Sequence, residues 1–290
     1  MDIVKSLLFG VLEGITEWLP VSSTGHLILL GRIMTLQIGM DDRFSALFSE
    51  LFQVLIQLGA IGACAIRCFD RLFPRECPIS TCERRNALSL YGKLMLSGIP
   101  AALLGIAGDR IFEHFTGKDI DGLLYRASTV ALMLIVYGIL FLIPEKRLPV
   151  IGDRVSDVAS ISAPKAFAIG CFQALSIIPG TSRSGSTILG GMLLGLDRRT
   201  AAEYSFLLAI PTMTGASLLK VLKFARAISA LSLEVPREAY VLLFTGMLSA
   251  FLVSLVMIDF LLDFVKKHTF RGFGIYRILL GCAVLLLSAV

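Results

Sequence analysis

The sequence predicts an all-α polytopic membrane protein, with six transmembrane helices and two re-entrant helix pairs in an inverted-topology internal repeat. Hydrophobic residues make up 56% of the 290 positions, and the mean hydropathy is +0.80. Soluble domains have an apolar share of only about 45 to 50%. Six apolar stretches are long enough to cross a bilayer, which takes roughly 17 to 25 residues. Two further apolar regions are each interrupted by a polar segment that contains proline.

The interrupted regions are 1–34, broken at Pro20-Val21-Ser22-Ser23, and 163–195, broken at Pro179-Gly180-Thr181-Ser182. Each half is too short to span a bilayer, so we expect two re-entrant pairs whose tips meet inside the membrane. The six predicted crossings are 48–66, 88–107, 126–143, 201–222, 239–262 and 273–290.

These elements predict a single membrane domain over 1–290, with repeat one at 1–145 and repeat two at 160–290. An odd number of crossings in each unit requires the second copy to be inverted relative to the first. The two interrupted segments also align, with Glu13 opposite Gln173 and Thr16 opposite Ser176. After one residue is skipped, Pro20 falls opposite Pro179, Ser22 opposite Thr181 and Ser23 opposite Ser182. The alignment therefore supports an internal duplication.

The distribution of basic residues predicts the orientation. The segments 67–93, 144–165, 198–199 and 263–271 hold 15 Lys and Arg, whereas the opposite side holds nine from Arg32 onward. This excess predicts that the first group is cytoplasmic and that the first re-entrant pair enters from outside. Loop 220–237 is an exception, because it holds four basic residues and falls on the side that is predicted to be outside. The net charge of +5 suits a membrane surface, and no motif indicates a nucleic-acid partner.

Two acidic residues, Glu13 and Glu17, precede the first break. Their spacing of four puts both carboxylates on one face of a helix. Paired carboxylates at membrane depth suit a divalent cation such as Mg²⁺ or Ca²⁺, or an acid/base pair. The alternative is that one carboxylate pairs with Arg183 and the other lies at a hydrated interface.

Hydroxyl side chains follow each break, where a new helix is predicted to begin. Ser22, Ser23 and Thr24 follow the first break, and Thr181 and Ser182 belong to the second. Such residues cap a helix by default, but two opposed helix starts can bind an anion. An arginine between them would complete a phosphate site, because guanidinium is a planar fork for phosphate oxygens. Capping alone does not explain Arg183.

His26 lies about one helical turn beyond Ser23, so it could exchange a proton with a serine, a water or a leaving phosphate. A structural role for this histidine is the alternative. Gly25 and Gly185 would let the backbone approach a ligand, although small residues also serve helix packing in lipid.

The segments 13–26 and 179–187 resemble the two signature motifs of the undecaprenyl pyrophosphate phosphatase family, also called bacitracin resistance proteins. The resemblance extends over essentially the whole chain. It implies a multi-pass bacterial inner-membrane hydrolase that converts the C55 isoprenoid pyrophosphate to the monophosphate, with the active site facing the periplasm. It also implies dependence on a divalent cation.

By motif position, the resemblance makes Ser23 the nucleophile, His26 its proton partner and Arg183 the pyrophosphate clamp. Glu13 and Glu17 would be metal or acid/base carboxylates. The remaining residues of the two motifs would line the phosphate site, namely Ser22, Thr24, Gly25, Thr181, Ser182, Ser184, Gly185 and Ser186. The sequence does not decide between attack by Ser23 and attack by water activated by a carboxylate. A homodimer is compatible with the sequence, which leaves the oligomeric state open.

A transporter or flippase for an anionic lipid is the main alternative function, because inverted repeats with broken helices are typical of secondary transporters. A transporter has less need of a serine, a histidine and two carboxylates together. A purely structural membrane protein would leave the buried Glu and Arg residues unexplained.

Overall fold

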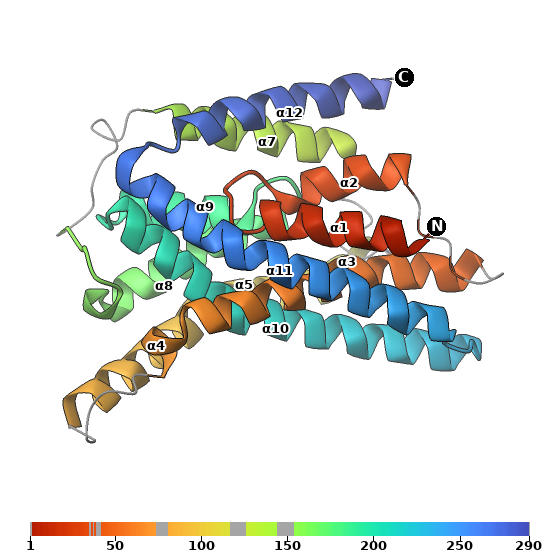
Figure 1. Cartoon of the computed structure of the whole chain (residues 1–290), viewed down its shortest axis with the longest axis horizontal. Coiled ribbons are helices and arrows are strands. Elements are labelled where there is room, and N and C mark those ends of the chain that lie inside the picture. Colours follow the sequence, from red (N-terminus) through yellow and green to blue (C-terminus); the bar gives the residue numbers. More distant parts are fainter. Residues whose placement is uncertain are drawn as a thin grey trace.

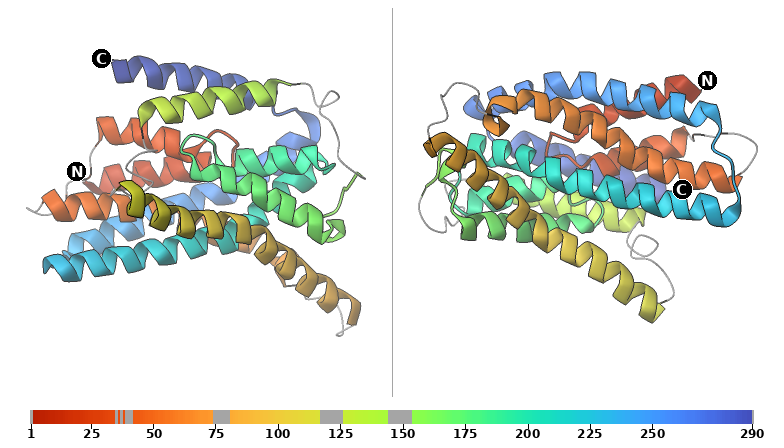
Figure 2. Two further views of the ribbon diagram at one scale, coloured as in Figure 1. Left: turned by 180° about the vertical axis from the view of Figure 1, so that it is seen from behind. Right: turned by 90° about the horizontal axis from the view of Figure 1, so that it is seen from below.

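The computed structural model describes residues 2–34, 36, 38, 42–73, 81–116, 126–143 and 154–289. Within these ranges the regular structure is helical, apart from one isolated parallel bridge between Val155 and Leu196. The helices run side by side in a bundle, and the long α5 diverges from it at one end (Figures 1 and 2). The all-helical prediction is confirmed for this part of the chain.

The first half of the chain contains α1 (Asp2–Thr16), α2 (Ser23–Ile33), α3 (Asp42–Arg67), α4 (Phe69–Leu72), α5 (Thr81–Thr116) and α7 (Ala127–Leu142). The second half contains the 3₁₀ helix η2 (Val158–Ser160), α8 (Ala163–Ala174), the 3₁₀ helix η3 (Leu175–Ile177), α9 (Arg183–Leu193), α10 (Arg198–Leu231), α11 (Arg237–Lys267) and α12 (Arg271–Ala289).

Four described helices are long and apolar enough to cross a membrane: α3, residues Ala87–Gly108 of α5, α10 and α11. They correspond to the predicted crossings at 48–66, 88–107, 201–222 and 239–262, and each helix extends beyond the predicted span. The other two predicted crossings fall on α7, a shorter apolar helix, and on α12.

The predicted loop at 220–237 is wrong over most of its length, because α10 continues to Leu231. Lys220 lies on that helix and pairs with Glu50 at 2.7 Å. The predicted helix stopped where charged residues begin, because the prediction used hydropathy alone. A helix continues past the apolar part of its sequence when its side chains find partners. The predicted loop 67–93 likewise contains α4 and the start of α5.

The two interrupted regions fold as pairs of short helices, as their sequences predict. Helices α1, α2, α8 and α9 have 15, 11, 12 and 11 residues. Ser22 caps α2 at φ 74°, and Ser182 caps α9 at φ 69°. A positive φ is uncommon for any residue other than glycine, so the two breaks share the same unusual backbone conformation.

The structural correspondence of the breaks differs from the sequence alignment. Ser22 matches Ser182 in both φ and capping role, whereas the alignment with one skipped residue put Ser22 opposite Thr181. Each cap oxygen accepts from a glycine amide three residues later, Gly25 or Gly185. The proline positions had favoured the skipped residue, but the backbone conformation places the two helix starts in an ungapped register.

Each short helix pair packs against a long helix from the other half of the chain. Helix α1 lies along α11, and α8 lies along α5, while α3 contacts α10 and α7 contacts α12. Ser6 in α1 donates to the Leu242 carbonyl at 2.5 Å, and Ser97 in α5 donates to the Ala166 carbonyl at 2.6 Å. A Cβ on Gly10 would collide with the backbone of α11, so this glycine allows α1 to approach closely. The two halves are therefore interlocked.

The breaks lie in the apolar interior of this bundle. Trp18, just before Pro20, is fully buried and packs edge to face against Phe206 of α10, with ring centroids 5.0 Å apart. Both residues belong to the largest hydrophobic cluster. Polar groups at the breaks therefore need partners from the protein itself.

Candidate active site

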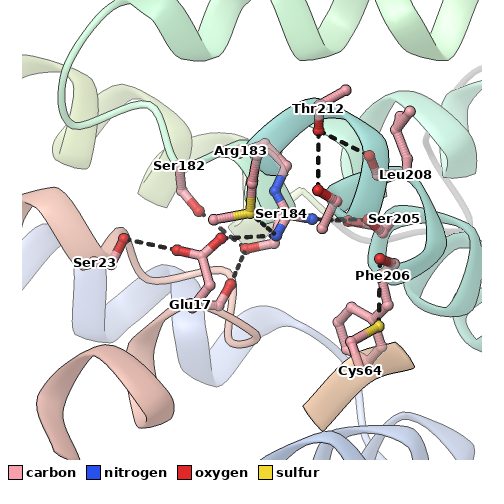
Figure 3. A network of polar contacts seen from close by, with 12 residues as sticks. Glu17, Ser23, Cys64, Ser182, Arg183, Ser184, Ser205, Phe206, Leu208 and Thr212 are labelled. Carbon is pink, nitrogen blue, oxygen red and sulfur yellow. Dashed lines mark hydrogen bonds and ion pairs between the residues drawn. The ribbon is translucent and has the colours of Figure 1, made fainter. Parts of the chain in front are cut away.

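An ion pair joins the two interrupted regions. Arg183 Nη2 donates to Glu17 Oε1 at 2.7 Å, and the other carboxylate oxygen, Oε2, accepts from Ser23 Oγ at 3.0 Å (Figure 3). Glu17 follows α1, Ser23 begins α2 and Arg183 begins α9. Three residues that the sequence predicts for the site are thus brought into one chain of contacts, and Arg183 orients the carboxylate toward the serine.

Arg183 is held by further contacts with α10. Its Nη1 donates to the Ser205 carbonyl oxygen at 2.7 Å, and its guanidinium carbon lies 5.9 Å from the centroid of the Trp18 ring. Ser205 Oγ in turn bonds Thr187 Oγ1 at 2.6 Å. Among the described residues, the buried Nε of Arg183 has no hydrogen-bond partner. The arginine is therefore rigid and retains one N–H that an anion could use.

Ser184 fastens α9 to the first break. Its hydroxyl is 3.1 Å from the Glu17 carbonyl oxygen and 3.2 Å from that of Leu19. The same hydroxyl lies 3.2 Å from Ser182 Oγ. Ser184 thus contributes to the site by locking the two breaks together.

Glu13 is completely buried beside Glu17. Its side chain is 0% exposed, and within the described part of the chain neither carboxylate oxygen has a hydrogen-bond partner. Glu17 lies one helical turn further along, and its backbone N–H donates to the Glu13 carbonyl oxygen at 2.9 Å. The alternative given in the sequence analysis agrees with the structure in one part only. One carboxylate pairs with Arg183, as that alternative expects, but the other is buried and does not lie at a hydrated interface. A buried carboxylate without a partner is costly, so Glu13 is set up for a ligand or a proton.

In the structure, His26 and Ser23 have different hydrogen-bond partners. His26 Nδ1 lies 2.7 Å from the Ser22 carbonyl oxygen, and Nε2 lies 2.6 Å from Tyr276 Oη of α12. Residues three apart share a helix face, but the imidazole is directed to α12, and Glu17 is the partner of Ser23.

The remaining predicted residues have different surroundings. Ser186 donates to the Phe172 carbonyl at 2.6 Å and bonds Tyr137 Oη at 3.0 Å, so it packs α9 against α8 and α7. Thr181 Oγ1 is buried and has no partner among the described residues, whereas Thr24 is half-buried. A Cβ on Gly25 would lie 3.3 Å from Leu134 of α7, and one on Gly185 would lie 3.2 Å from Arg277. Both glycines are therefore adjacent to other protein groups.

Arg277 is the residue that the sequence analysis missed. It is fully buried on α12 and donates to the carbonyl oxygens of Pro20 at 3.0 Å, Gly180 at 2.8 Å and Thr181 at 3.0 Å. Its guanidinium also lies over the Tyr137 ring at 5.4 Å. An arginine inside the apolar stretch 273–290 was the available signal, because a charge in a membrane span needs a reason. One side chain thus satisfies carbonyls from both breaks.

Four helices in the described part of the chain are apolar enough to cross a membrane, which indicates a multi-pass membrane protein. Acidic and basic side chains are buried where the two helix interruptions meet, and this marks a candidate functional site. Comparison with known proteins gives the family. The family model described as "Bacitracin resistance protein BacA" matches residues 6–283, so the chain belongs to this family.

Curated relatives carry an enzyme name. An undecaprenyl-diphosphatase from Streptococcus mutans is 45% identical over 284 residues, which cover 98% of this chain and 95% of the relative. One from Acetivibrio thermocellus is 42% identical over 286 residues, covering 99% and 97%, respectively. One from Enterococcus faecalis is 41% identical over 292 residues, covering 100% and 98%. These names support the phosphatase interpretation rather than the transporter.

Proposed function

We propose that this protein is an undecaprenyl-diphosphatase, which hydrolyses the C55 isoprenoid pyrophosphate to the monophosphate and inorganic phosphate. The observation that carries the proposal is the Ser23–Glu17–Arg183 contact chain at the meeting point of the two breaks. It combines a hydroxyl, a base and a guanidinium, groups that can serve phosphoryl transfer as nucleophile, proton acceptor and charge stabiliser. The names of the relatives supply the substrate class. Such an enzyme recycles the lipid carrier of cell-wall synthesis and fits the bacitracin resistance family.

In this proposal the pyrophosphate head binds between the starts of α2 and α9. Arg183 offers the unpaired Nε–H, and the first amides of both helices offer further donors. Hydroxyls of the two motifs would line the same region, namely Ser22, Thr24, Thr181, Ser182, Ser184 and Ser186, with Gly25 and Gly185 between them. The isoprenoid tail would lie along the apolar helices.

Ser23 is the proposed nucleophile. Glu17 Oε2 accepts the proton of Ser23 Oγ, and Oγ attacks the terminal phosphorus while the bond to the bridging oxygen breaks. The lipid monophosphate leaves, and water then hydrolyses the phosphoserine to release phosphate. Arg183 keeps the carboxylate oriented throughout, because its Nη2 bonds the other oxygen at 2.7 Å. In the alternative mechanism, Glu17 takes the proton from a water and no phosphoserine forms.

Glu13 and Glu17 are the proposed ligands of a divalent cation, Mg²⁺ or Ca²⁺. The unpartnered, fully buried oxygens of Glu13 beside a second carboxylate fit such an ion. No group of three or more His, Cys, Asp or Glu residues gathers at one place among the described residues. Mg²⁺ is commonly held by one or two carboxylates together with substrate phosphates and waters, so two are enough. A bound cation would neutralise charge that develops on the phosphate oxygens.

The proposed topology is six crossings with two re-entrant pairs in inverted repeats, and a site open to the periplasm. The interlocked packing supports it, because the contact of α1 with α11 corresponds to that of α8 with α5 when the helices of the two halves are matched in chain order. The matching caps Ser22 and Ser182 support it as well. The excess of basic residues on one side supports the outward orientation.

The test is phosphate release from undecaprenyl or farnesyl pyrophosphate by purified protein in detergent, with Mg²⁺, with Ca²⁺ and with EDTA. We expect cation-dependent release by the wild type and a loss of about 10² to 10⁴ in kcat for Ser23→Ala. Asp263→Asn is the matched polar control, because Asp263 is exposed and forms a local ion pair with Lys266, three residues away. Absence of release from folded wild type with every cation would contradict the proposal.

The nucleophile is tested with substrate labelled by ³²P on the terminal phosphate and quenched in acid. A Ser23 mechanism predicts label on the wild-type protein and none on Ser23→Ala. Release of phosphate without labelled protein, together with substantial activity of Ser23→Ala, would instead support attack by water.

A further inference from the structure

We propose that Tyr276 is a positioning residue for His26 in the proposed reaction. The two residues are 250 positions apart, yet Tyr276 Oη lies 2.6 Å from His26 Nε2. Their rings are nearly parallel, with an interplanar angle of 7° and centroids 5.6 Å apart. This inference rests on the proposed phosphatase function. It adds to the site a residue of α12, which lies outside the two signature motifs.

The contacts of His26 determine which ring nitrogen carries the proton. Nδ1 faces the Ser22 carbonyl oxygen at 2.7 Å, and a carbonyl can only accept a hydrogen bond. Nδ1 therefore donates. In neutral imidazole the other nitrogen then has a free lone pair, so Nε2 accepts from the Tyr276 hydroxyl. The two hydrogen bonds together fix the tautomer and the orientation of the ring.

This arrangement gives His26 a role distinct from that of Glu17. Ser23 already donates to Glu17, so His26 is not needed as the base for the nucleophile. Its Nε2 is held by Tyr276 of α12, the helix whose Arg277 binds the carbonyls of both breaks. An imidazole held in one tautomer and one orientation is prepared to accept or return a proton in the proposed reaction.

The exposure of the pair points in the same direction. His26 is 8% exposed, whereas Tyr276 is 44% exposed. The tyrosine thus links a buried imidazole to the surface of α12. A tyrosine with a purely packing role would not need its hydroxyl at this place.

The first test is ¹⁵N NMR of protein labelled at histidine, in detergent. The chain has three histidines, so variants at His114 and His268 assign the signal of His26. We expect neutral imidazole protonated on Nδ1 in the wild type, and a shift of the Nε2 resonance in Tyr276→Phe as the hydrogen bond is lost. A proton on Nε2 alone, or on both nitrogens, in the wild type would overturn the proposal.

The second test separates kcat from KM in phosphate release. Tyr276→Phe should lower kcat about threefold to tenfold, the worth of one hydrogen bond. KM should change by less than about twofold, because the groups proposed to bind phosphate stay in place. Tyr240→Phe is the matched control on α11, where the tyrosine is exposed, and it should match the wild type.

The outcomes are distinguishable from failure of the proposed function. An unchanged kcat in Tyr276→Phe, or a raised KM with unchanged kcat, would overturn the positioning role while leaving the phosphatase intact. If the wild type releases no phosphate, the proposed function fails, and the positioning role in that reaction fails with it. The NMR spectrum would in that case still report whether Tyr276 holds the tautomer of His26.

Discussion

Replacing Arg277 by methionine tests whether one buried side chain holds the two breaks together. The change removes the donors to the carbonyls of Pro20, Gly180 and Thr181, which lie at 3.0, 2.8 and 3.0 Å. Hydrogen bonds from a charged donor contribute about 1.5 to 3 kcal/mol each, a gross loss of about 5 to 9 kcal/mol. Removing a buried charge offsets part of this, so we expect a net loss of about 3 to 5 kcal/mol.

This loss converts to a shift in melting temperature. Unfolding entropy of about 2.1 cal/mol/K per residue gives about 0.6 kcal/mol/K for a chain of this length, so Tm should fall by about 5 to 8 °C. The chain has one tryptophan, and Trp18 is fully buried at the first break. Its fluorescence during heating in detergent is therefore a local probe. Arg277→Lys should lie between methionine and wild type, because one ammonium cannot replace the planar fork.

Arg67→Met is the matched control for this prediction. Arg67 pairs with Asp259 at 2.8 Å, and the two side chains are 42% and 51% exposed. Exposed pairs contribute less than about 1 kcal/mol. If the Tm of Arg277→Met lies as close to the wild-type Tm as that of Arg67→Met does, the prediction that Arg277 holds the two breaks together is refuted.

Three further predictions follow from the packing and from the carboxylates. Gly10→Ala should lower the free energy of unfolding by about 1 to 3 kcal/mol, because the added methyl group pushes α1 away from α11. Thermal unfolding measures this loss, and the control Gly92→Ala, with open space around the glycine, should not destabilise the protein. Equal effects of the two variants would contradict the packing. Ser97→Ala should cost about 1 to 2 kcal/mol by removing the bond to the Ala166 carbonyl, and an unchanged Tm would contradict this. Glu13→Gln should raise the Mg²⁺ concentration for half-maximal phosphate release at least about tenfold, and an unchanged requirement would exclude Glu13 as a ligand.

Much of the fold could be predicted because the signals are local. Apolar length indicates a crossing, and Pro20 and Ser22, or Pro179 and Ser182, mark where one short helix ends and the next begins. Helix ends were less predictable, since α10 continues through charged residues to Leu231. The residue-by-residue alignment of the two breaks could not be predicted from the sequence either, because the prolines favour one alignment and the cap conformations favour another.

The site was predictable where both partners lie in the motifs. Glu17, Ser23 and Arg183 carry polar groups beside a helix break, and such groups come together when the breaks meet. The contact between His26 and Tyr276 was not predictable, because it depends on how α12 packs on the first break. The direction of the His26 ring follows from that packing rather than from its spacing to Ser23.

The central claim is that both breaks form one catalytic unit through Glu17 and Arg183. It is tested most directly by a double-mutant cycle on phosphate release, with Glu17→Gln, Arg183→Gln and the double variant, each checked for folding by Trp18 fluorescence. Residues that act as a unit show strongly non-additive effects. We therefore expect the double variant to lose little more activity than the worse single variant. Losses that multiply, or single variants that keep wild-type kcat, would contradict the account.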